Sequence, residues 1–363
     1  MQRLSTVADV SARIDAAGVP VITLGETEFG DPVIAARRGP GTGPELMITS
    51  GAHAGEPSGV YGAVETLVNW DSALDLTVVP LRDPFAFEGM ERCLERVTGV
   101  RPTLANHDQL HRFLTDHAVD VVAQEADFVL VDLGQALAAS MLPADPPAGP
   151  RLIEARLNQL LAAEPHLVAK LTGRRVFYPS NAGPTSEDVG DFERAFSAEI
   201  SAEGLVRDMN RRFGQPDAPT EVRLVAEFAE SVNPYAILDL HEGQGESFYL
   251  FVSEYGADER TTRYADAIMD RLEAAGTRPT TLDDVVARLG ERVRDSFTEG
   301  RPGVLVERKG RRNPEGQFSS FSAKFGPSIT VESGRWAPLA QRIAIHRAAV
   351  AATVESILGE RRG

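Results

Sequence analysis

A short apolar run followed by a loop of small residues is the feature that most restricts how this chain can fold. The run occupies residues 46–49, and residues 51–59 then spell Gly-Ala-His-Ala-Gly-Glu-Pro-Ser-Gly. An apolar run that ends in small residues is typical of a buried strand, and Pro57 suits the first turn of a following helix. His53 and Glu56 therefore lie on the connection at the carboxyl end of a strand, where open α/β sheets place ligands.

These two side chains have the chemistry of metal ligands. An imidazole and a carboxylate three positions apart on a tight loop can meet one metal ion. A catalytic zinc takes three such nitrogen or oxygen ligands and leaves one position for water. The loop supplies only two of them, so a third has to come from another part of the chain.

Strand and helix patterns alternate over most of the sequence. Strands are expected at 21–24, 33–36, 46–50, 76–81, 235–240, 247–252, 303–307 and 328–332. Helices are expected at 5–17, 57–68, 218–231 and 337–358. This alternation predicts a three-layer α/β fold with helices on both faces of a mixed central sheet. A chain of 363 residues that is 42% apolar can form one large catalytic domain over 1–363.

Residues 91–190 depart from this pattern. Helical periodicity dominates there, at 101–118 and 151–163, and one strand is expected at 127–131. None of the motifs that point to a shared chemical site falls in the block. We therefore interpret 91–190 as a mainly helical insertion within the domain, which would act as a lid or a specificity element.

Composition excludes several classes of partner. The net charge of -16 argues against binding to duplex nucleic acid or to an anionic membrane. No stretch approaches the roughly 20 apolar residues that span a bilayer, and the N-terminus lacks the apolar core of a secretory signal. The single cysteine, Cys93, rules out an intramolecular disulfide and fits a reducing compartment. We expect a cytoplasmic protein; the oligomeric state has no signal in the sequence.

Further motifs place chemical groups where apolar strands end. His241 follows one apolar run, Glu332 interrupts another, and Asn210 and Arg211 form a compact pair of donors. A strand-end histidine can complete a His/Glu/His metal site from a neighbouring strand. A carboxylate in an apolar strand is partly desolvated, which raises its pKa and suits a general base acting on metal-bound water. The Asn-Arg pair can donate hydrogen bonds to both oxygens of a carboxylate.

Each motif also has a structural explanation when it is taken alone. His241 can be a core histidine bonded to backbone, and Glu332 can pair with one of the many arginines. Asn210 and Arg211 can be a helix cap beside a solvated charge. The agreement of four motifs on one placement favours a shared site over four separate structural roles.

The chain resembles the zinc carboxypeptidase (M14 metallopeptidase) family, which includes the succinylglutamate desuccinylase and aspartoacylase branch. That family orders its motifs as His-x-x-Glu, Asn-Arg, a strand-end His and a strand Glu, and this chain has the same order. Residues 24–34 are similar to the family's Gly-x-Ser-x-x-Gly-Arg-x-Ile opening, and residues 78–89 resemble its Asn-Pro-Asp-Gly strand exit. The similarity covers residues 20–90 and 205–350.

The resemblance implies a metal centre with a general base. One zinc ion per chain would be held by His53, Glu56 and His241. Glu332 would activate the zinc-bound water and pass its proton to the leaving amine.

The resemblance also implies roles for arginines. Asn210 and Arg211 would hold a free carboxylate of the substrate. An upstream arginine would polarise the scissile carbonyl, and the two candidates for that role are Arg194 and Arg207.

The substrate class stays open at this point. The family's carboxypeptidases carry a mobile tyrosine shortly before the catalytic Glu, whereas residues 304–331 contain no tyrosine. We expect zinc-dependent hydrolysis of an amide next to a free carboxylate, on a small peptide or an N-acyl amino acid. The alternatives are an N-acyl amino acid deacylase of the succinylglutamate desuccinylase or aspartoacylase type, and a catalytically inactive binding module. The intact ligand set and Glu332 argue against the inactive module.

A competing metal site is suggested by His107 and His111. They lie four positions apart on an expected helix, with His117 nearby and Asp108 where helical zinc proteases have Glu. Asp is one methylene shorter and would reach a metal-bound water poorly. The helical pattern turns these histidines toward solvent, so a polar helical face is the favoured interpretation.

Overall fold

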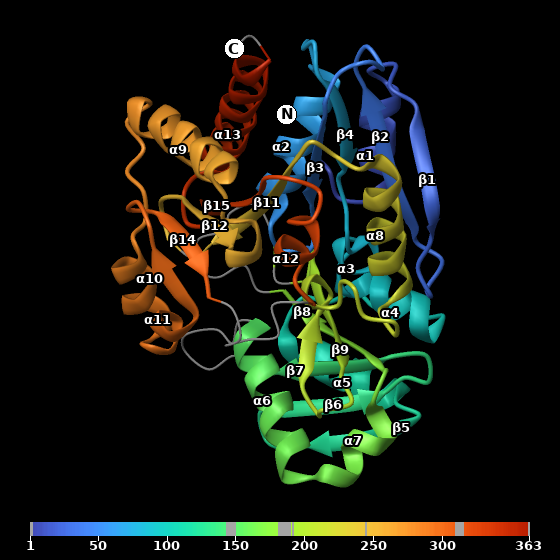
Figure 1. Ribbon diagram of the computed structural model, residues 1–363. Helices are drawn as coiled ribbons and strands as arrows, with labels where there is room; N and C mark the ends of the chain where they lie inside the picture. The colour runs from blue at the N-terminus through green and yellow to red at the C-terminus, as the bar shows by residue number, and fades with distance from the viewer. Residues whose placement is uncertain are drawn as a thin grey trace.

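The computed structural model describes residues 3–142, 150–180, 190, 192–243, 245–308 and 316–361. Their strands form two sheets, and Figure 1 shows the smaller one below the larger. The large sheet has the order β1-β2-β4-β3-β11-β15-β12-β14-β13. Its strands are β1 (Val21–Glu26), β2 (Pro32–Arg38), β3 (Glu45–Ser50), β4 (Asp75–Val79), β11 (Ala236–Gly243), β12 (Tyr249–Ser253), β13 (Phe297–Glu299), β14 (Val304–Glu307) and β15 (Ser328–Gly334).

The large sheet is mixed because its centre is parallel and its margins are antiparallel. β4, β3, β11 and β15 are successive parallel neighbours. β1 and β2 at one margin, and β13 at the other, pair antiparallel with their neighbours. The carboxyl ends of the four central strands therefore lie along one edge of the sheet.

Helices cover both faces of this sheet. On β3, Leu46 and Ile48 contact one hydrophobic cluster, whereas Met47 between them contacts another. The first cluster includes side chains of α1 (Val7–Asp15), α2 (Pro57–Val68), α9 (Glu259–Ala274) and α13 (Leu339–Glu360). The second includes side chains of α8 (Thr220–Val232) and α12 (Phe318–Ser322). The predicted three-layer α/β fold with a mixed central sheet is confirmed.

The second sheet has the order β10-β9-β8-β7-β6-β5. Its strands are β5 (Asp120–Gln124), β6 (Phe128–Asp132), β7 (Leu137–Met141), β8 (Arg175–Pro179), β9 (Ala195–Ile200) and β10 (Val206–Asp208). One face packs against α6 (Pro150–Ala163) and α7 (Pro165–Leu171), whose apolar side chains form a separate core with it. The other face joins the main core through α3 (Pro84–Phe87), α4 (Met90–Thr98) and α5 (His107–His117).

The predicted insertion at 91–190 contains both helices and four of the six strands of this sheet. α4 to α7 hold more of its described residues than β5 to β8 do, as the helical patterning indicated. The sheet itself was not foreseen, and it continues past residue 190 into β9 and β10. Residues 143–149 and 181–189 of the block lie outside the described part. That 91–190 is one insertion in a single domain stays a prediction.

Shorter elements complete the fold. The helix expected at 101–118 begins only at residue 107, because the Asn106 side chain caps α5 by accepting a hydrogen bond from the Gln109 backbone nitrogen. α10 (Leu282–Leu289), α11 (Arg292–Ser296) and the 3₁₀ helices η1 (Met209–Arg211) and η2 (Glu254–Gly256) lie in connections. Within the described ranges, no helix is both long enough and apolar enough to cross a bilayer.

Close packing of α2 against β11 holds the loop that carries His53 and Glu56 in place, and it depends on Gly59. A Cβ at Gly59 would lie 2.5 Å from the Leu240 carbonyl oxygen, which belongs to rigid backbone. We expect Gly59→Ala to lower the free energy of unfolding by about 1–3 kcal/mol through overpacking, as measured by urea denaturation. Gly359 in α13 is the matched control, because a Cβ there would meet nothing within 4 Å. Gly359→Ala should leave stability unchanged or raise it; equal losses in both variants would contradict the packing argument.

Candidate metal centre

The parallel pairing of β3 with β11 brings the three predicted ligands together. His53 and Glu56 lie on the loop between β3 and α2, and His241 lies near the end of β11. Glu56 places Oε1 2.9 Å from His53 Nδ1 and Oε2 2.9 Å from His241 Nδ1. One ligand atom from each residue lies within 4.8 Å of the other two. Among the described residues, this is the one group with metal-ligand geometry.

The donor set fits a divalent cation such as zinc. Two imidazole nitrogens and a carboxylate face one another, as a three-ligand zinc site requires. Burial alone would raise the pKa of Glu56, but the charges of His53 and His241 outweigh it and hold that pKa well below its usual value. The Glu56 carboxylate is therefore ionised, which is the form that binds a metal.

Asp239 and Arg82 contact the outer nitrogen of His241, on the side away from Glu56. His241 Nε2 lies 2.9 Å from Asp239 Oδ2, and Arg82 Nη2 donates to the same oxygen at 2.7 Å. Thr49 Oγ1 donates to Asp239 Oδ1 at 2.7 Å. Such a carboxylate on the outer nitrogen fixes the tautomer of a metal-ligating histidine and turns Nδ1 toward the ion. Arg82 is itself held against the rings of Phe213 and Phe318.

Asp208 faces the outer nitrogen of His53 but does not hydrogen-bond to it. Asp208 Oδ1 lies 3.7 Å from His53 Nε2, and Arg211 Nε donates to Asp208 Oδ2 at 3.1 Å. The His53 ring also stacks on Phe196 of β9, with ring centroids 5.5 Å apart. The second sheet, which carries Phe196 and Asp208, therefore forms one wall of the metal centre.

Glu332 lies directly beside His241 because the two are register partners on β15 and β11. Their neighbours Val331 and Leu240 point into the cluster on the opposite face, so Glu332 and His241 share the α8 face of the sheet. Burial raises the pKa of Glu332 to about 7, with the charge of Glu56 adding to it and the charge of His241 opposing it. A carboxylate with this pKa is suited to accept a proton near neutral pH.

Asn210 and Arg211 contact the residues that lie around the two histidine ligands. They lie on η1, directly after β10. Asn210 Oδ1 accepts a hydrogen bond from Arg82 Nη1 at 2.8 Å, and Arg211 contacts Asp208. The Arg211 side chain keeps 36% of its surface exposed, so part of its guanidinium faces solvent.

Neither predicted carbonyl-polarising arginine lies at the metal cluster. Arg194 donates from Nη2 to the Leu4 carbonyl at 2.8 Å, and its guanidinium lies 4.0 Å above the Phe87 ring centre, where it anchors the N-terminal segment. Arg207 contacts Glu203 at 3.7 Å. Strand alternation turns Arg207 away from the face that carries Asp208. The expectation that one of these two arginines faces the scissile bond is therefore not supported by the geometry.

Two other arginines occupy the centre instead. Arg82 contacts His241, and Arg335 Nη2 lies 3.5 Å from Glu56 Oε1. Arg82 was missed although it follows the end of β4, the placement that singled out the other motifs. Asp239 was missed as well, although a carboxylate inside the apolar run 236–240 is an equally strong signal.

The competing histidine pair has no set of metal ligands around it within the described ranges. His107 is buried, with 8% of its surface exposed, and its ring packs against Phe192 with centroids 5.0 Å apart. The prediction that His107 faces solvent is wrong, because the second sheet and its flanking segment cover this side of α5. Neither His107 nor His111 belongs to a metal-ligand group among the described residues.

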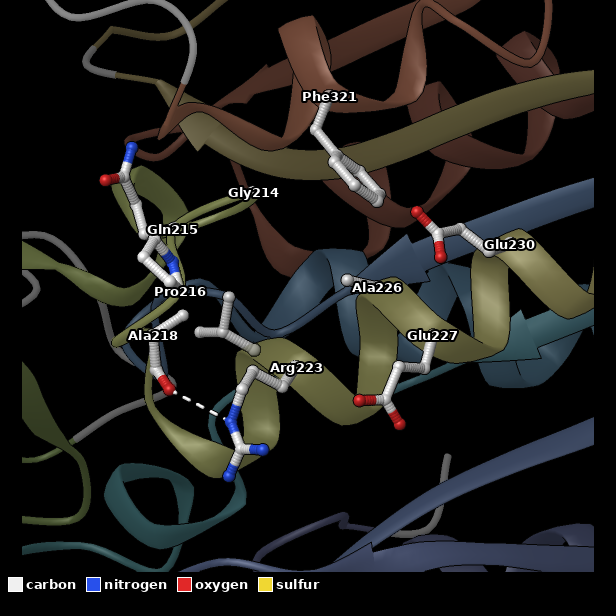
Figure 2. Close-up of a pocket in the computed structure, with 10 residues that line it drawn as sticks. Gly214, Gln215, Pro216, Ala218, Arg223, Ala226, Glu227, Glu230 and Phe321 are labelled. Atoms are coloured by element: carbon white, nitrogen blue, oxygen red, sulfur yellow. Dashed lines mark hydrogen bonds between the residues drawn. The ribbon is translucent and has the colours of Figure 1, made fainter.

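A separate shallow cavity lies on the surface near α8. It has a volume of about 260 Å³ and is lined by the loop after η1, by α8 and by Phe321 (Figure 2). Arg223 donates to the Ala218 carbonyl at 3.2 Å inside it, as the dashed line in Figure 2 marks. Its Glu230 is paired with Lys324. None of the metal-cluster residues lines this cavity, so it is not the reaction site.

Comparison with known proteins identifies the fold. Models of known families and the sequences of curated proteins give no match to this chain. Among solved structures, a metallo-carboxypeptidase from Burkholderia cenocepacia matches 97% of this chain and 69% of its own length, with a TM-score of 0.50 and 12% identity. A candidate metallopeptidase from Shewanella denitrificans OS217 matches 96% of this chain and 90% of its own length, with a TM-score of 0.50 and 14% identity.

A candidate carboxypeptidase from Burkholderia mallei ATCC 23344 gives the same score of 0.50 at 14% identity, over 97% of this chain and 68% of its own. The chain has the metallo-carboxypeptidase fold. This confirms the fold expected from the resemblance of the motifs. The likeness reaches across both sheets, because it covers nearly the whole chain.

The geometry predicts one metal ion, bound between His53, Glu56 and His241. Elemental analysis of untagged wild-type protein should find about one zinc per chain, and His241→Ala should lose it because a three-ligand site does not survive removal of one ligand. His111→Ala is the matched control and should keep the metal. Metal retained by His241→Ala, or lost by His111→Ala, would show that the ion is bound elsewhere.

Proposed function

We propose that this protein is a zinc-dependent hydrolase that cleaves an amide bond next to a free carboxylate. The observation that carries the proposal is a His/Glu/His cluster with Glu332 beside it, since Glu332 and the ligand His241 are register partners on adjacent strands. A general base beside a three-ligand site is the arrangement that metal-assisted hydrolysis requires. The fold supports the proposal, because metallo-carboxypeptidases share it.

A metal held by His53, Glu56 and His241 would supply Lewis acidity, which polarises a carbonyl and lowers the pKa of water. Glu332 would accept the proton of the attacking water and deliver it to the nitrogen that leaves. Asp239 would keep the His241 imidazole oriented through its outer nitrogen, and the Phe196 ring would hold His53 by stacking on it. The proton thus moves from water to the amine by way of one carboxylate, and no other group has to change its charge.

The substrate's free carboxylate would bind at Asn210 and Arg211. The exposed part of the Arg211 guanidinium offers planar donors that match a carboxylate. Arg82 orients the Asn210 amide by donating to its oxygen, which leaves the amide nitrogen to face the substrate. Recognition of a carboxylate beside the cleaved bond would make the enzyme act on chain ends or on single acylated amino acids.

A second candidate within the same chemistry is a deacylase of N-acyl amino acids. The absence of tyrosine from residues 304–331 favours it, because the carboxypeptidases of this family use a tyrosine there. A panel that compares blocked dipeptides with N-acyl amino acids separates the two. Hydrolysis of neither set by metal-loaded protein would favour a catalytically inactive binding module.

Replacement of Glu332 tests the proposed reaction. Glu332→Gln should lower kcat by about 10²–10⁴-fold, since general-base catalysis contributes that much. The metal content should not change, because Glu332 is not one of the three ligands. Steady-state kinetics together with elemental analysis checks both expectations. Unchanged turnover in the metal-loaded variant would exclude Glu332 as the base.

Replacement of Arg211 tests carboxylate recognition. Arg211→Ala should reduce kcat/KM for free-acid substrates by about 10–100-fold, the factor expected for losing hydrogen bonds to a charged group. Amidated substrates of the same sequence should lose much less. Arg223→Ala is a suitable control, since this exposed arginine lies in the separate cavity of Figure 2. Equal losses on free-acid and amidated substrates would contradict the assigned role.

A further inference from the structure

A second group of polar side chains lies beside His53, on the wall that the second sheet forms. Three aromatic rings connect the two groups. The ring of Phe196 stacks on His53 at 5.5 Å and on Tyr178 at 5.4 Å, and the planes are inclined by 16° and 20°. Tyr178 and Phe196 are register partners on β8 and β9. The row therefore leads from the metal centre into the second sheet.

Tyr178 ends this row with a hydroxyl that lacks a partner. The side chain is fully buried, and its oxygen makes no hydrogen bond to any described residue. Buried hydroxyls are nearly always hydrogen-bonded, so this one indicates a missing partner. Burial raises the pKa of Tyr178, and the charges of Glu154 and Asp208 raise it further.

Glu154 on α6 is the second group without a partner. It makes no hydrogen bond or ion pair within the described residues, although it is half-buried. Burial raises its pKa, and Asp208 adds to this effect, while the charges of Arg211, Arg151 and His53 oppose it. Arg211 is already paired with Asp208 at 3.1 Å. Geometry places Glu154 beside Asp208 as well: Asn158, one helical turn further along α6, accepts a hydrogen bond from the Val206 backbone nitrogen at 2.8 Å, and Val206 begins the strand β10 that ends at Asp208.

Core packing fixes Glu154 in this place. Its neighbours Ile153 and Leu157 on α6 belong to the same hydrophobic cluster as Tyr178 and Val176. The helix thus rests on the second sheet with Glu154 at its first turns, and Figure 1 shows α6 rising beside β7 and β8 toward the large sheet. A carboxylate held this way is preorganised, so a ligand would not have to order it.

We infer that Glu154 and Tyr178 form a subsite for the positively charged side chain of the substrate residue whose carboxylate binds Arg211. This inference rests on the proposed function. A guanidinium or ammonium group brings the donors and the charge that the two oxygens lack. The substrate residue would then be held at both ends, by its carboxylate at Asn210 and Arg211 and by its basic side chain at Glu154.

A pair of substrates that differ only in charge tests the subsite. Benzoyl-glycyl-arginine and benzoyl-glycyl-citrulline have side chains of the same length and nearly the same shape. Wild-type protein should show kcat/KM at least about tenfold higher for the arginine substrate, the factor of one charged hydrogen bond. Glu154→Gln should bring the ratio of the two close to one, and Tyr178→Phe should reduce it by about 2–10-fold.

Glu164→Gln is the matched control. Glu164 follows the end of α6, and its side chain is 53% exposed. The variant removes the same charge and should keep the wild-type ratio. A ratio near one in the wild type, or a ratio that Glu154→Gln leaves unchanged, overturns the subsite.

Binding of free amino acids separates this inference from the proposed reaction. In calorimetric titrations, arginine should bind the wild type at least about tenfold more tightly than citrulline, and Glu154→Gln should remove that difference. If neither dipeptide is hydrolysed but this difference is found, the reaction is wrong and the subsite stands. If the dipeptides are hydrolysed and neither assay favours arginine, the reaction stands and the subsite is wrong.

Discussion

The parallel register of β3, β11 and β15 is the constraint on which the rest of the site depends. Ser50 pairs with Leu240, and His241 pairs with Glu332, so three strand ends from distant parts of the chain meet at one edge. Because side chains alternate along a strand, this register also decides that His241 and Glu332 share a face. A shift of one residue in either pairing would move the side chain of His241 or of Glu332 to the opposite face of the sheet.

A buried network of charges supports this edge. Arg82 at the end of β4 contacts Asp239 on β11 and Asn210 on η1, with the Phe213 and Phe318 rings against its guanidinium. Removing one partner from a buried ion pair costs about 3–5 kcal/mol, because a charge is left unmatched. The same contacts that hold the elements together therefore orient the ligand His241, and stability and function are coupled here.

The second sheet contributes the other side of the site. Phe196 packs on His53, Asp208 faces its outer nitrogen, and α6 brings Glu154 toward the same region. Its outer face has a separate core, built with α6 and α7, while its inner face shares the main core with the large sheet, so both cores hold these side chains in place. In the proposed enzyme, the large sheet carries the reaction and the second sheet selects the substrate.

Much of this arrangement follows from local sequence. The apolar run before His53, the run before His241 and the run around Glu332 each determined a strand with a polar end, and the structure has β3, β11 and β15 there. Apart from the strand expected at 127–131, the second sheet was missed because its strands are short and β6, β7 and β8 are buried on both faces, so their side chains do not alternate between polar and apolar. The sequence also left the carbonyl-polarising arginine undecided between Arg194 and Arg207, because spacing cannot show which way a guanidinium turns. Only the tertiary structure decided that Arg82 fills the place behind His241, since that depends on β4 and β11 ending at the same edge. The sequence alone thus determined which kinds of side chain stand at the strand ends. The positions of these side chains relative to one another were decided by strand pairing between segments far apart in sequence.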